Sequence, residues 1–382
     1  MYFTHTRFPP LVSRADLRPC NCPRHPPREC RKYARNRVPL VIPFPGPHDG
    51  IPEVVMRVSP SVRAVQVPDE NPMHPDFTPI YLVGNTNVLS IDSGEAVERY
   101  RWMLRGYLAA TEGVEIATAA ITHHHSDHSG NLKWIRKALD ADITVTSEAR
   151  PLLKGMLPKK RVETLKTETD FHVEGGPRLQ VLRTPGHSVD SICFYLEEEG
   201  VLFSGDTLLG SSTTTVNNLK DYRETLQRLV ALPNLKVICP GHGPLVHDPR
   251  ERLQSYIDHR NMRERQIVDV LAKGKPISSW DIMRKLYPDI DKRLRRAADN
   301  NVRVHLAQLE AEGRLNVEPG KRRKKSRSTK DVEHARSREK VIKLGKRYEA
   351  EDSRALIARQ ENPPTDEWKV PPKYQLVGSA KD

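Results

Sequence analysis

The chain has 382 residues, enough for one large domain and one smaller domain. No apolar run approaches the length of a membrane span, which excludes a membrane-spanning protein of the helical kind. The formal net charge of +13 resides at the ends, since residues 1–50 carry nine Lys or Arg against three Asp or Glu and residues 320–382 carry 18 against 10. This distribution indicates solvated or nucleic-acid-binding tails rather than a basic catalytic face.

Residues 1–52 contain eleven prolines and many arginines, without apolar periodicity. Because proline lacks the backbone donor that helices and sheets need, we predict a disordered Pro/Arg-rich extension. Its composition resembles a mitochondrial transit peptide, but the prolines interrupt an amphipathic helix, and Met56 is an alternative start of the protein. The alternative to a disordered tail is a small zinc knuckle formed by Cys20, Cys22, His25 and Cys30, although the spacing of these residues is unusual for such a site.

From Val54 onward the sequence changes to short β-branched runs, which predict strands over 54–56, 62–67, 80–83 and 88–91. A turn follows and opens a helix predicted over 97–110. Asp92, at this turn, either hydrogen-bonds the histidine-rich loop that comes next or acts as a helix cap.

Residues 122–130 read Thr-His-His-His-Ser-Asp-His-Ser-Gly and follow a short apolar run that predicts a buried strand. Five potential metal ligands fall within six residues: His123, His124, His125, Asp127 and His128. Imidazole and carboxylate groups are donors that zinc-type cations prefer, and a cation offsets the cost of holding such groups together. A surface histidine tract is the alternative, but such a tract lacks the aspartate and the preceding strand.

The spacing within this loop predicts two cations. Residues two apart in an extended loop point the same way, so His123 and His125 can hold one ion. Asp127 and His128 lie just beyond and turn toward a second ion. Gly130 then lets the chain turn into a helix predicted over 132–139.

Three later strands end in short Gly-containing turns that each present a polar side chain. The strand over 179–182 leads to His187 in Thr-Pro-Gly-His-Ser, and the strand over 236–239 leads to His242 in Pro-Gly-His-Gly-Pro. The strand over 201–203 leads to Asp206, whose two oxygens could bridge two cations. A structural histidine and a turn-forming aspartate are the alternatives. Beside the histidine-rich loop, the ligand interpretation is favoured.

Two cysteines indicate the compartment. Cys193 and Cys239 lie in apolar runs, which predicts buried free thiols of a cytosolic-type protein. We therefore expect a cytoplasmic location, with the mitochondrial matrix as the alternative that the Arg-rich extension leaves open.

Together these motifs resemble the metal motifs of the metallo-β-lactamase-fold hydrolases, in the same order. The resemblance implies an α/β (α+β) chain with a four-layer αββα sandwich as the catalytic domain, over residues 53–258, and two Zn²⁺ per chain. It implies one metal held by His123, His125 and His187. It implies a second held by Asp127, His128 and His242, with Asp206 bridging the two. Apart from the resemblance, proton transfer in such a site would fall to Asp127, once freed from the metal, or to solvent. His124 should not bind.

Residues 257–267 and 300–315 are similar to the beta-lactamase-like protein 2 family, which includes a single-strand endoribonuclease of mitochondria. That family carries a small winged-helix-like domain, which the resemblance places at 259–319. Asn131 stands where the family pattern has a second glycine, which should affect the turn and not the metals.

The residues of this smaller domain support a helical module. Ser278 is predicted to cap a helix through Leu286, and Val302 begins a later helical stripe. Before that stripe stands a basic group that could meet phosphates, made of Arg293, Arg295 and Arg296. The alternative is that the module only closes over the edge of the active site and sets oligomer contacts.

Residues 320–382 are predicted to be a basic tail. Six of the seven residues 321–327 are basic, which suits polyanions without specificity. Alternating acids and bases predict a helix over 331–360. The last twenty residues are Pro-rich and are predicted to be unstructured, with a docking peptide as the alternative.

The predicted activity is hydrolysis. Two cations that share a water lower its pKa toward neutrality, and the bridging hydroxide attacks a carbonyl or phosphorus. Single-stranded RNA is the first substrate hypothesis, from the family resemblance and the basic ends. A thioester or ester is the second, as in relatives of the glyoxalase II and polyketide-thioesterase types. The third hypothesis is a nucleic-acid-binding regulator with a structural metal site, but a structural zinc normally closes with four ligands.

Overall fold

The computed structural model describes residues 55–68, 76–111, 113–153, 155–323, 363 and 368–378. The predicted extension over 1–52, its zinc-knuckle alternative and the helix predicted over 331–360 therefore lie outside the described residues. None of the helices in the described part combines the length and the apolar character that crossing a membrane requires.

The first sheet follows chain order. Its strands are β1 (Val55–Ser59), β2 (Val62–Pro68), β3 (Phe77–Val83), β4 (Asn87–Ile91), β5 (Glu115–Ala120), β6 (Asp142–Thr146) and β7 (Val162–Leu165). The pairs from β1 to β4 are antiparallel and those from β4 to β7 are parallel. Parallel neighbours need crossovers, which here contain α1 (Glu98–Ala110), α2 (Ser126–Ser129), α3 (Leu132–Leu139) and α4 (Ala149–Leu152).

The second sheet has the order β12-β11-β10-β9-β8. Its strands are β8 (Thr169–Phe171), β9 (Leu179–Arg183), β10 (Ile192–Leu196), β11 (Val201–Gly205) and β12 (Val237–Pro240). The pair β11 and β12 is parallel, and α5 (Leu219–Val230) is the crossover between them. The long helix α6 (Pro249–Leu271) follows β12.

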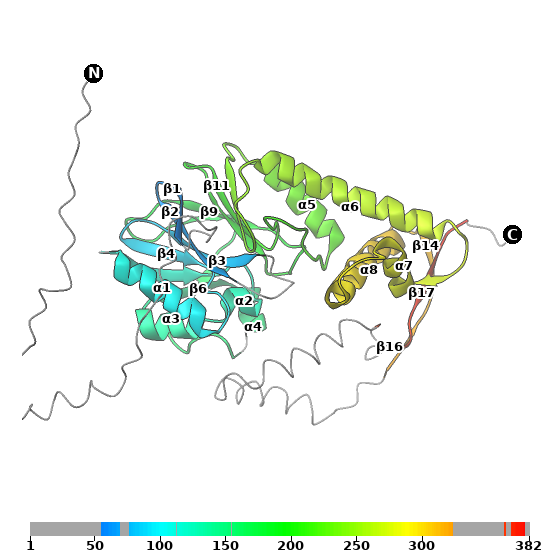
Figure 1. Ribbon diagram of the computed structural model, residues 1–382, viewed down its shortest axis with the longest axis horizontal. Helices are drawn as coiled ribbons and strands as arrows, with labels where there is room; N and C mark the ends of the chain where they lie inside the picture. The colour runs from blue at the N-terminus through cyan, green and yellow to red at the C-terminus, as the bar shows by residue number, and fades with distance from the viewer. Residues whose placement is uncertain are drawn as a thin grey trace, which may run out of the picture. The chain divides into compact units, whose positions relative to one another are not determined.

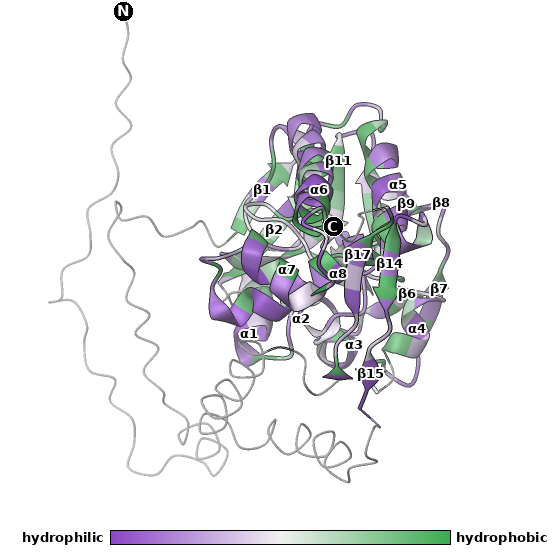
Figure 2. Cartoon of the chain, turned by 90° about the vertical axis from the view of Figure 1, so that its right-hand side faces the viewer, coloured by the Kyte–Doolittle hydropathy of each residue, from purple (hydrophilic) through white to green (hydrophobic). Residues whose placement is uncertain are grey.

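The two sheets and their helices form four layers (Figure 1). On β10, Phe194 faces the first sheet, whereas Cys193 and Tyr195 face the cluster that contains residues of α5 and α6. On the far side, Leu104 of α1 and Ile135 of α3 pack against the outer face of the first sheet. The alternation of strand residues thus buries both faces of each sheet. β11 is buried along its length, and its hydrophobic first three residues, Val-Leu-Phe, account for its green colour in Figure 2. The predicted αββα sandwich is confirmed.

Two local predictions, on the buried thiols and on Gly130, can be compared with the structure. Cys193 and Cys239 are buried and free, as predicted. Gly130 leads into α3 as predicted, but it has an ordinary helical φ of −63°, so the turn does not use the conformational freedom of glycine. A Cβ at this position would lie 2.5 Å from the carbonyl oxygen of Ser126 and 2.6 Å from the nitrogen of Ala96, so the residue is needed for a close backbone approach.

A second, smaller set of elements follows α6 and has the strand order β13-β17-β14. It contains β13 (Ile277–Ser278), α7 (Ser279–Leu286), the 3-10 turn η2 (Lys292–Leu294), α8 (Arg295–Ala311), β14 (Leu315–Glu318) and β17 (Lys373–Leu376). The hydroxyl of Ser278 accepts from the amide of Asp281, which confirms the predicted cap. The predicted boundary after residue 258 falls inside α6, because Ile267 and Leu271 of that helix belong to the core of this smaller domain.

The prediction of a terminal tail over 320–382 is wrong at both ends of that range. β15 (Lys321–Arg322) pairs with β16 (Trp368–Val370), and β17 is the middle strand of the three-stranded sheet. Tyr374 and Leu376 pack against the core of the smaller domain, which stabilises this late strand. Residues 324–366 are therefore an insertion between two paired strands, although local composition resembles that of a free tail.

Candidate metal centre

The structure brings all seven predicted ligands together at one edge of the two sheets. Within each of two groups, one ligand atom per residue lies within 4.8 Å of the others. The first group is His123, His125, His187 and Asp206. The second group is Asp127, His128, Asp206 and His242. Asp206 is common to both groups, and His124 belongs to neither.

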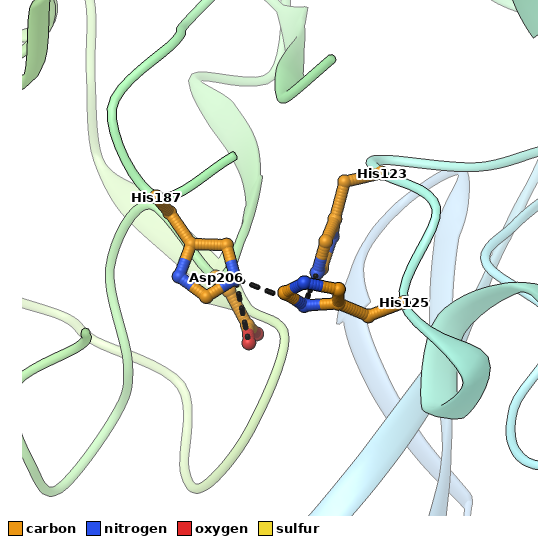
Figure 3. Close-up of side chains that lie close together, drawn as sticks. All are labelled: His123, His125, His187 and Asp206. Carbon is orange, nitrogen blue, oxygen red and sulfur yellow. Dashed lines mark hydrogen bonds and ion pairs between the residues drawn. The ribbon is translucent and has the colours of Figure 1, made fainter. Parts of the chain in front are cut away.

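In the first group, three imidazole rings converge (Figure 3). The Nδ1 atom of His125 lies 2.8 Å from Nε2 of His123 and 3.1 Å from Nε2 of His187. The Oδ2 atom of Asp206 lies 3.6 Å from Nε2 of His187. Two residues of this group follow β5 and two come from the second sheet, so strands of both sheets must pack correctly to form it.

The second group lies on the other side of the Asp206 carboxylate. Nε2 of His128 is 3.3 Å from Oδ2 of Asp127 and 3.3 Å from Oδ1 of Asp206. Nε2 of His242 is 3.1 Å from the same Asp127 oxygen and 3.4 Å from the same Asp206 oxygen. Asp206 thus turns Oδ2 toward the first group and Oδ1 toward the second, as a bridging ligand would.

Four of these histidines are held through the other ring nitrogen, and in His123 this is Nδ1, which lies 3.1 Å from the hydroxyl of Thr122. Nδ1 of His128 lies 2.8 Å from Oδ2 of Asp92, which confirms the predicted hydrogen bond from Asp92 to the loop. Nδ1 of His242 lies 2.8 Å from the hydroxyl of Thr78, and Nδ1 of His187 lies 2.8 Å from the carbonyl oxygen of Thr215. Such contacts fix the ring orientation and leave Nε2 to face the centre.

Sequence reasoning missed the threonine contacts. Thr78 lies within β3, and nothing in the strand pattern distinguishes it. The run of threonines at 213–215 was a usable signal, since Thr214 also contacts Nδ1 of His187, at 3.0 Å. His124 instead contacts the buried carboxylate of Asp190 through Nδ1, at 2.8 Å, which explains its position outside both groups.

The residues present fit metal cations. Nε2 of His128 and Oδ1 of Asp206 are buried and face each other at 3.3 Å, yet neither makes a hydrogen bond to the described residues, which costs free energy unless a cation lies between such groups. Imidazole nitrogen and carboxylate oxygen are preferred ligands of zinc-type cations. Gly241 keeps the space open, because a Cβ there would lie 2.3 Å from Oδ1 of Asp206.

The pKa values differ between the two groups. Burial lowers the pKa of His123 well below its usual value and that of His125 to about 4, so both rings are neutral and able to bind metal. Burial likewise opposes the charged form of His242, but Asp206 and Asp127 raise its pKa to about 9. Burial opposes ionisation of Asp206, yet His242 and His128 hold its pKa well below the usual range. Metal binding to the second group must therefore displace protons.

A pocket of about 370 Å³ opens onto both groups through His125, Asp127, His187 and Asp206. The helical elements of the smaller domain form the opposite wall, with Tyr287, Ile290, Leu294 and Ala298. The smaller domain therefore closes over the edge of the metal centre. The predicted phosphate-binding group, Arg293, Arg295 and Arg296, does not line the pocket but flanks Leu294.

Hydrogen bonds fix this wall to the metal centre. The buried guanidinium of Arg260 donates to the carbonyl oxygen of Thr214 at 2.7 Å. The amide of Val216 donates to the side-chain oxygen of Asn301 at 3.1 Å, from α8. The loop between these contacts carries the Thr215 carbonyl that holds His187, so α6 and α8 both support one ligand.

Comparisons with known proteins agree with this geometry. The family described as "Metallo-beta-lactamase superfamily" matches residues 74–242, and "Beta-lactamase associated winged helix domain" matches residues 278–322. A Caenorhabditis elegans "Beta-lactamase-like protein 2 homolog" is 35% identical over 266 residues, which cover 68% of this chain and 88% of that protein.

Two further likenesses bear on fold and chemistry. An "Atrochrysone carboxyl ACP thioesterase" of Aspergillus fumigatus is 34% identical over 218 residues, covering 54% of this chain and 64% of that protein. The crystal structure of a metallo-beta-lactamase family protein from Thermus thermophilus superposes with a TM-score of 0.57 at 27% identity. That superposition covers 68% of this chain and 96% of the other.

Proposed function

Since the chain belongs to the metallo-β-lactamase superfamily, whose members are hydrolases, we propose that it is a dinuclear zinc hydrolase that cleaves single-stranded RNA. The observation that carries the two-metal part is the position of Asp206, which contributes one oxygen to each ligand group. A structural metal site would close with four ligands, whereas both groups here open onto a pocket. The hypothesis of a regulator with a structural metal is therefore disfavoured.

The seven residues form two sets of metal ligands. His123, His125 and His187 would hold one zinc ion. Asp127, His128 and His242 would hold the other, and Asp206 would bridge them. When bound, the two ions supply the Lewis acidity that makes water a nucleophile at neutral pH. Asp127 also lines the pocket, so its carboxylate, once freed from the metal, or solvent would receive the proton that the attacking water loses.

The arrangement of charge supports RNA as the substrate. Leu294 and Ala297 line the pocket, and the residues around them on the same turn are Lys292, Arg293, Arg295 and Arg296. Basic groups at a pocket edge suit the phosphates on either side of a reacting one. A single strand can place one nucleotide in a pocket of about 370 Å³, whereas a duplex keeps its bases stacked and paired.

A thioester is the second candidate, and a specific observation favours it. The similarity to the Aspergillus fumigatus thioesterase extends over 218 residues, and Ile290 and Leu294 give the pocket an apolar wall that an acyl group could contact. The same metal centre would serve both reactions, because a carbonyl and a phosphorus both develop negative oxygens during attack.

The test is a comparison of substrates on zinc-loaded full-length protein. We expect cleavage of a fluorescent single-stranded RNA oligomer, slower cleavage of the same sequence as a duplex and no hydrolysis of S-lactoylglutathione. Asp206→Ala should abolish cleavage, whereas His124→Ala should retain most of it. The reverse substrate preference would overturn the RNA proposal, and full activity of Asp206→Ala would overturn the metal mechanism for both substrates.

A further inference from the structure

The aromatic member of the pocket wall is Tyr287, at the end of α7. The guanidinium of Arg263, from α6, lies over the Tyr287 ring at 4.1 Å from the ring centre. A cation at this distance is attracted to the ring and holds it in place. Because Arg263 covers one face, the surface that the ring offers to the pocket is the other face or the ring edge.

The neighbours of Tyr287 make this wall apolar. Ile290, Leu294 and Ala298 line the pocket with it, whereas Ser212 and Thr213 supply hydroxyl groups from the catalytic domain. No Lys or Arg lines the pocket, as far as the described residues go. A ligand group that contacts this wall should therefore be uncharged, and an aromatic ring in the wall favours a flat one.

The surroundings of this wall have the opposite character. Arg295 and Arg296 follow Leu294 directly and begin α8, and Arg296 also donates to the carbonyl oxygen of Pro363 at 3.4 Å. Arg293 is neutralised in part by Asp291, at 2.6 Å. An uncharged part of the pocket wall that contains an aromatic side chain, with basic groups beside it, fits the chemistry of a nucleotide. A nucleotide joins a flat base with two π faces to anionic phosphates.

We propose that Tyr287 stacks on the nucleobase next to the cleaved phosphate, so that the winged-helix domain holds the base while the catalytic domain cuts the backbone. The inference rests on the proposed ribonuclease function and specifies how its substrate is held. A base must leave a helical stack to lie on Tyr287, which gives a physical reason for a preference for single strands. An acyl chain would use the apolar side chains and would gain little from the ring.

The experiment pairs loss of the ring with loss of the base. Zinc-loaded full-length protein is assayed on an RNA oligomer with one mapped cleavage site and on versions that lack the base at one position near that site. For the wild type, removal of one flanking base should raise KM about tenfold, the scale of a single base–aromatic stack, with little change in kcat. Removal of more distant bases should have a much smaller effect.

Variants of Tyr287 complete the double-mutant cycle, in which the ring and the base are removed singly and together. Tyr287→Leu should raise KM about tenfold on the intact oligomer and leave KM unchanged on the version that lacks the flanking base. Tyr287→Phe should behave as the wild type, since the ring is retained. Trp102→Leu is the matched control, because Trp102 is an aromatic residue on α1 with 66% of its surface exposed and does not line the pocket. 2-Aminopurine at the flanking position should lose emission on binding the wild type and keep it with Tyr287→Leu.

The outcomes separate the two proposals. If RNA is cleaved but loss of the ring and loss of the base act independently, or if no single flanking base matters to the wild type, the stacking inference is overturned and the ribonuclease stands. If the wild type leaves RNA intact and hydrolyses thioesters, the proposed function fails and the inference fails with it. If Tyr287→Leu does not fold, a wild type to which no single flanking base matters still overturns the stacking inference.

Discussion

The carboxylate of Asp92 and the ring of His128 are joined by a 2.8 Å hydrogen bond between Oδ2 and Nδ1, although 36 residues separate them. Asp92 also accepts from the amide of Thr122 at 2.7 Å and has a φ of 66°, a region that residues other than glycine rarely adopt. One carboxylate therefore fixes both the start of the histidine-rich loop and the ring of one ligand.

Replacement of this carboxylate should weaken metal binding. We predict that Asp92→Asn lowers zinc affinity about 10- to 100-fold, because the amide cannot orient the His128 ring as the carboxylate does. Competition with a chromophoric chelator measures this directly. Asp190→Asn is the matched control, since Asp190 is also a buried carboxylate but holds His124, which lies outside both ligand groups. Equal loss in the two variants would contradict the assignment.

Arg260 should contribute to stability because its charged side chain is buried and bonded. The residue is 2% exposed, donates to the Thr214 carbonyl and lies 5.3 Å from the centre of the Tyr222 ring. We predict that Arg260→Met lowers the free energy of unfolding by about 2 kcal/mol, because a buried carbonyl loses a charged donor. Urea unfolding of the zinc-loaded protein measures the change.

The control for that prediction lies near the start of the same helix, α6. Arg250 also donates to a backbone carbonyl, that of Val230, but its side chain is exposed. Arg250→Met should therefore change the unfolding free energy by less than about 0.5 kcal/mol. A loss as large as that of Arg260→Met would show that burial is not the deciding factor.

Acid should destabilise the winged-helix domain through His305. Burial, and then the charges of Arg260 and Arg223, lower the pKa of His305 to about 3. The native state thus binds fewer protons than the unfolded chain between the ordinary histidine pKa of about 6.5 and about 3. The stability that the neutral ring allows is complete above pH 6.5 and is lost progressively as the pH falls toward 3.

Replacement of the ring isolates this effect. Both ring nitrogens of His305 are buried and lack hydrogen-bond partners within the described part of the chain, so His305→Leu removes no hydrogen bond seen there. We predict that the slope of unfolding free energy against pH falls by about 1.4 kcal/mol per pH unit between pH 4 and 6. Denaturant unfolding at a series of pH values provides the measurement, and an unchanged slope would contradict the burial argument.

The insertion between β15 and β16 should contribute to RNA binding and not to folding. Residues 324–366 carry twelve Lys or Arg against eight Asp or Glu. Because Arg322 pairs with Trp368, an Asn-Gly turn can replace residues 324–366 without breaking the ladder. We predict an unchanged melting temperature and a shallower dependence of RNA affinity on salt.

Truncation at Lys321 makes the contrasting variant. It removes β17, whose Tyr374 and Leu376 pack against the domain core, so the winged-helix domain should lose stability. If the truncated chain melted at the temperature of the full chain, β17 would not contribute to the fold. If the turn replacement left the salt dependence unchanged, the basic insertion would be irrelevant to RNA.

The metal centre was predictable because its residues lie in short, local motifs. His187 and His242 each follow an apolar strand and a Pro-Gly turn, and the carboxyl ends of strands meet at one edge of a sheet. The sequence therefore indicated both the type of ligand and its place at the end of a strand. Asp92 was left open between two roles, since a turn aspartate has the same local pattern whether it caps a helix or contacts a distant ring.

The pocket wall at Tyr287 and the strand β17 could not be predicted, because they depend on contacts between residues that lie far apart in the sequence. Tyr287 lies about 80 residues after Asp206 along the chain, and only packing of the winged-helix domain brings it into the pocket. Lys373–Leu376 pairs with β14 across the whole insertion, which no local periodicity reveals. The buried position of Arg260 was equally hidden, because arginines on a charged helix are normally exposed.

The zinc content of the purified full-length protein tests the central claim most directly, after dialysis and by mass spectrometry of the metal. We predict about two zinc ions per chain for the wild type and for His124→Ala. Asp206→Ala should retain at most about one, because each ligand group loses a member. A wild type that binds no zinc, or an Asp206→Ala variant that keeps both ions, would contradict a pair of cations bridged by Asp206.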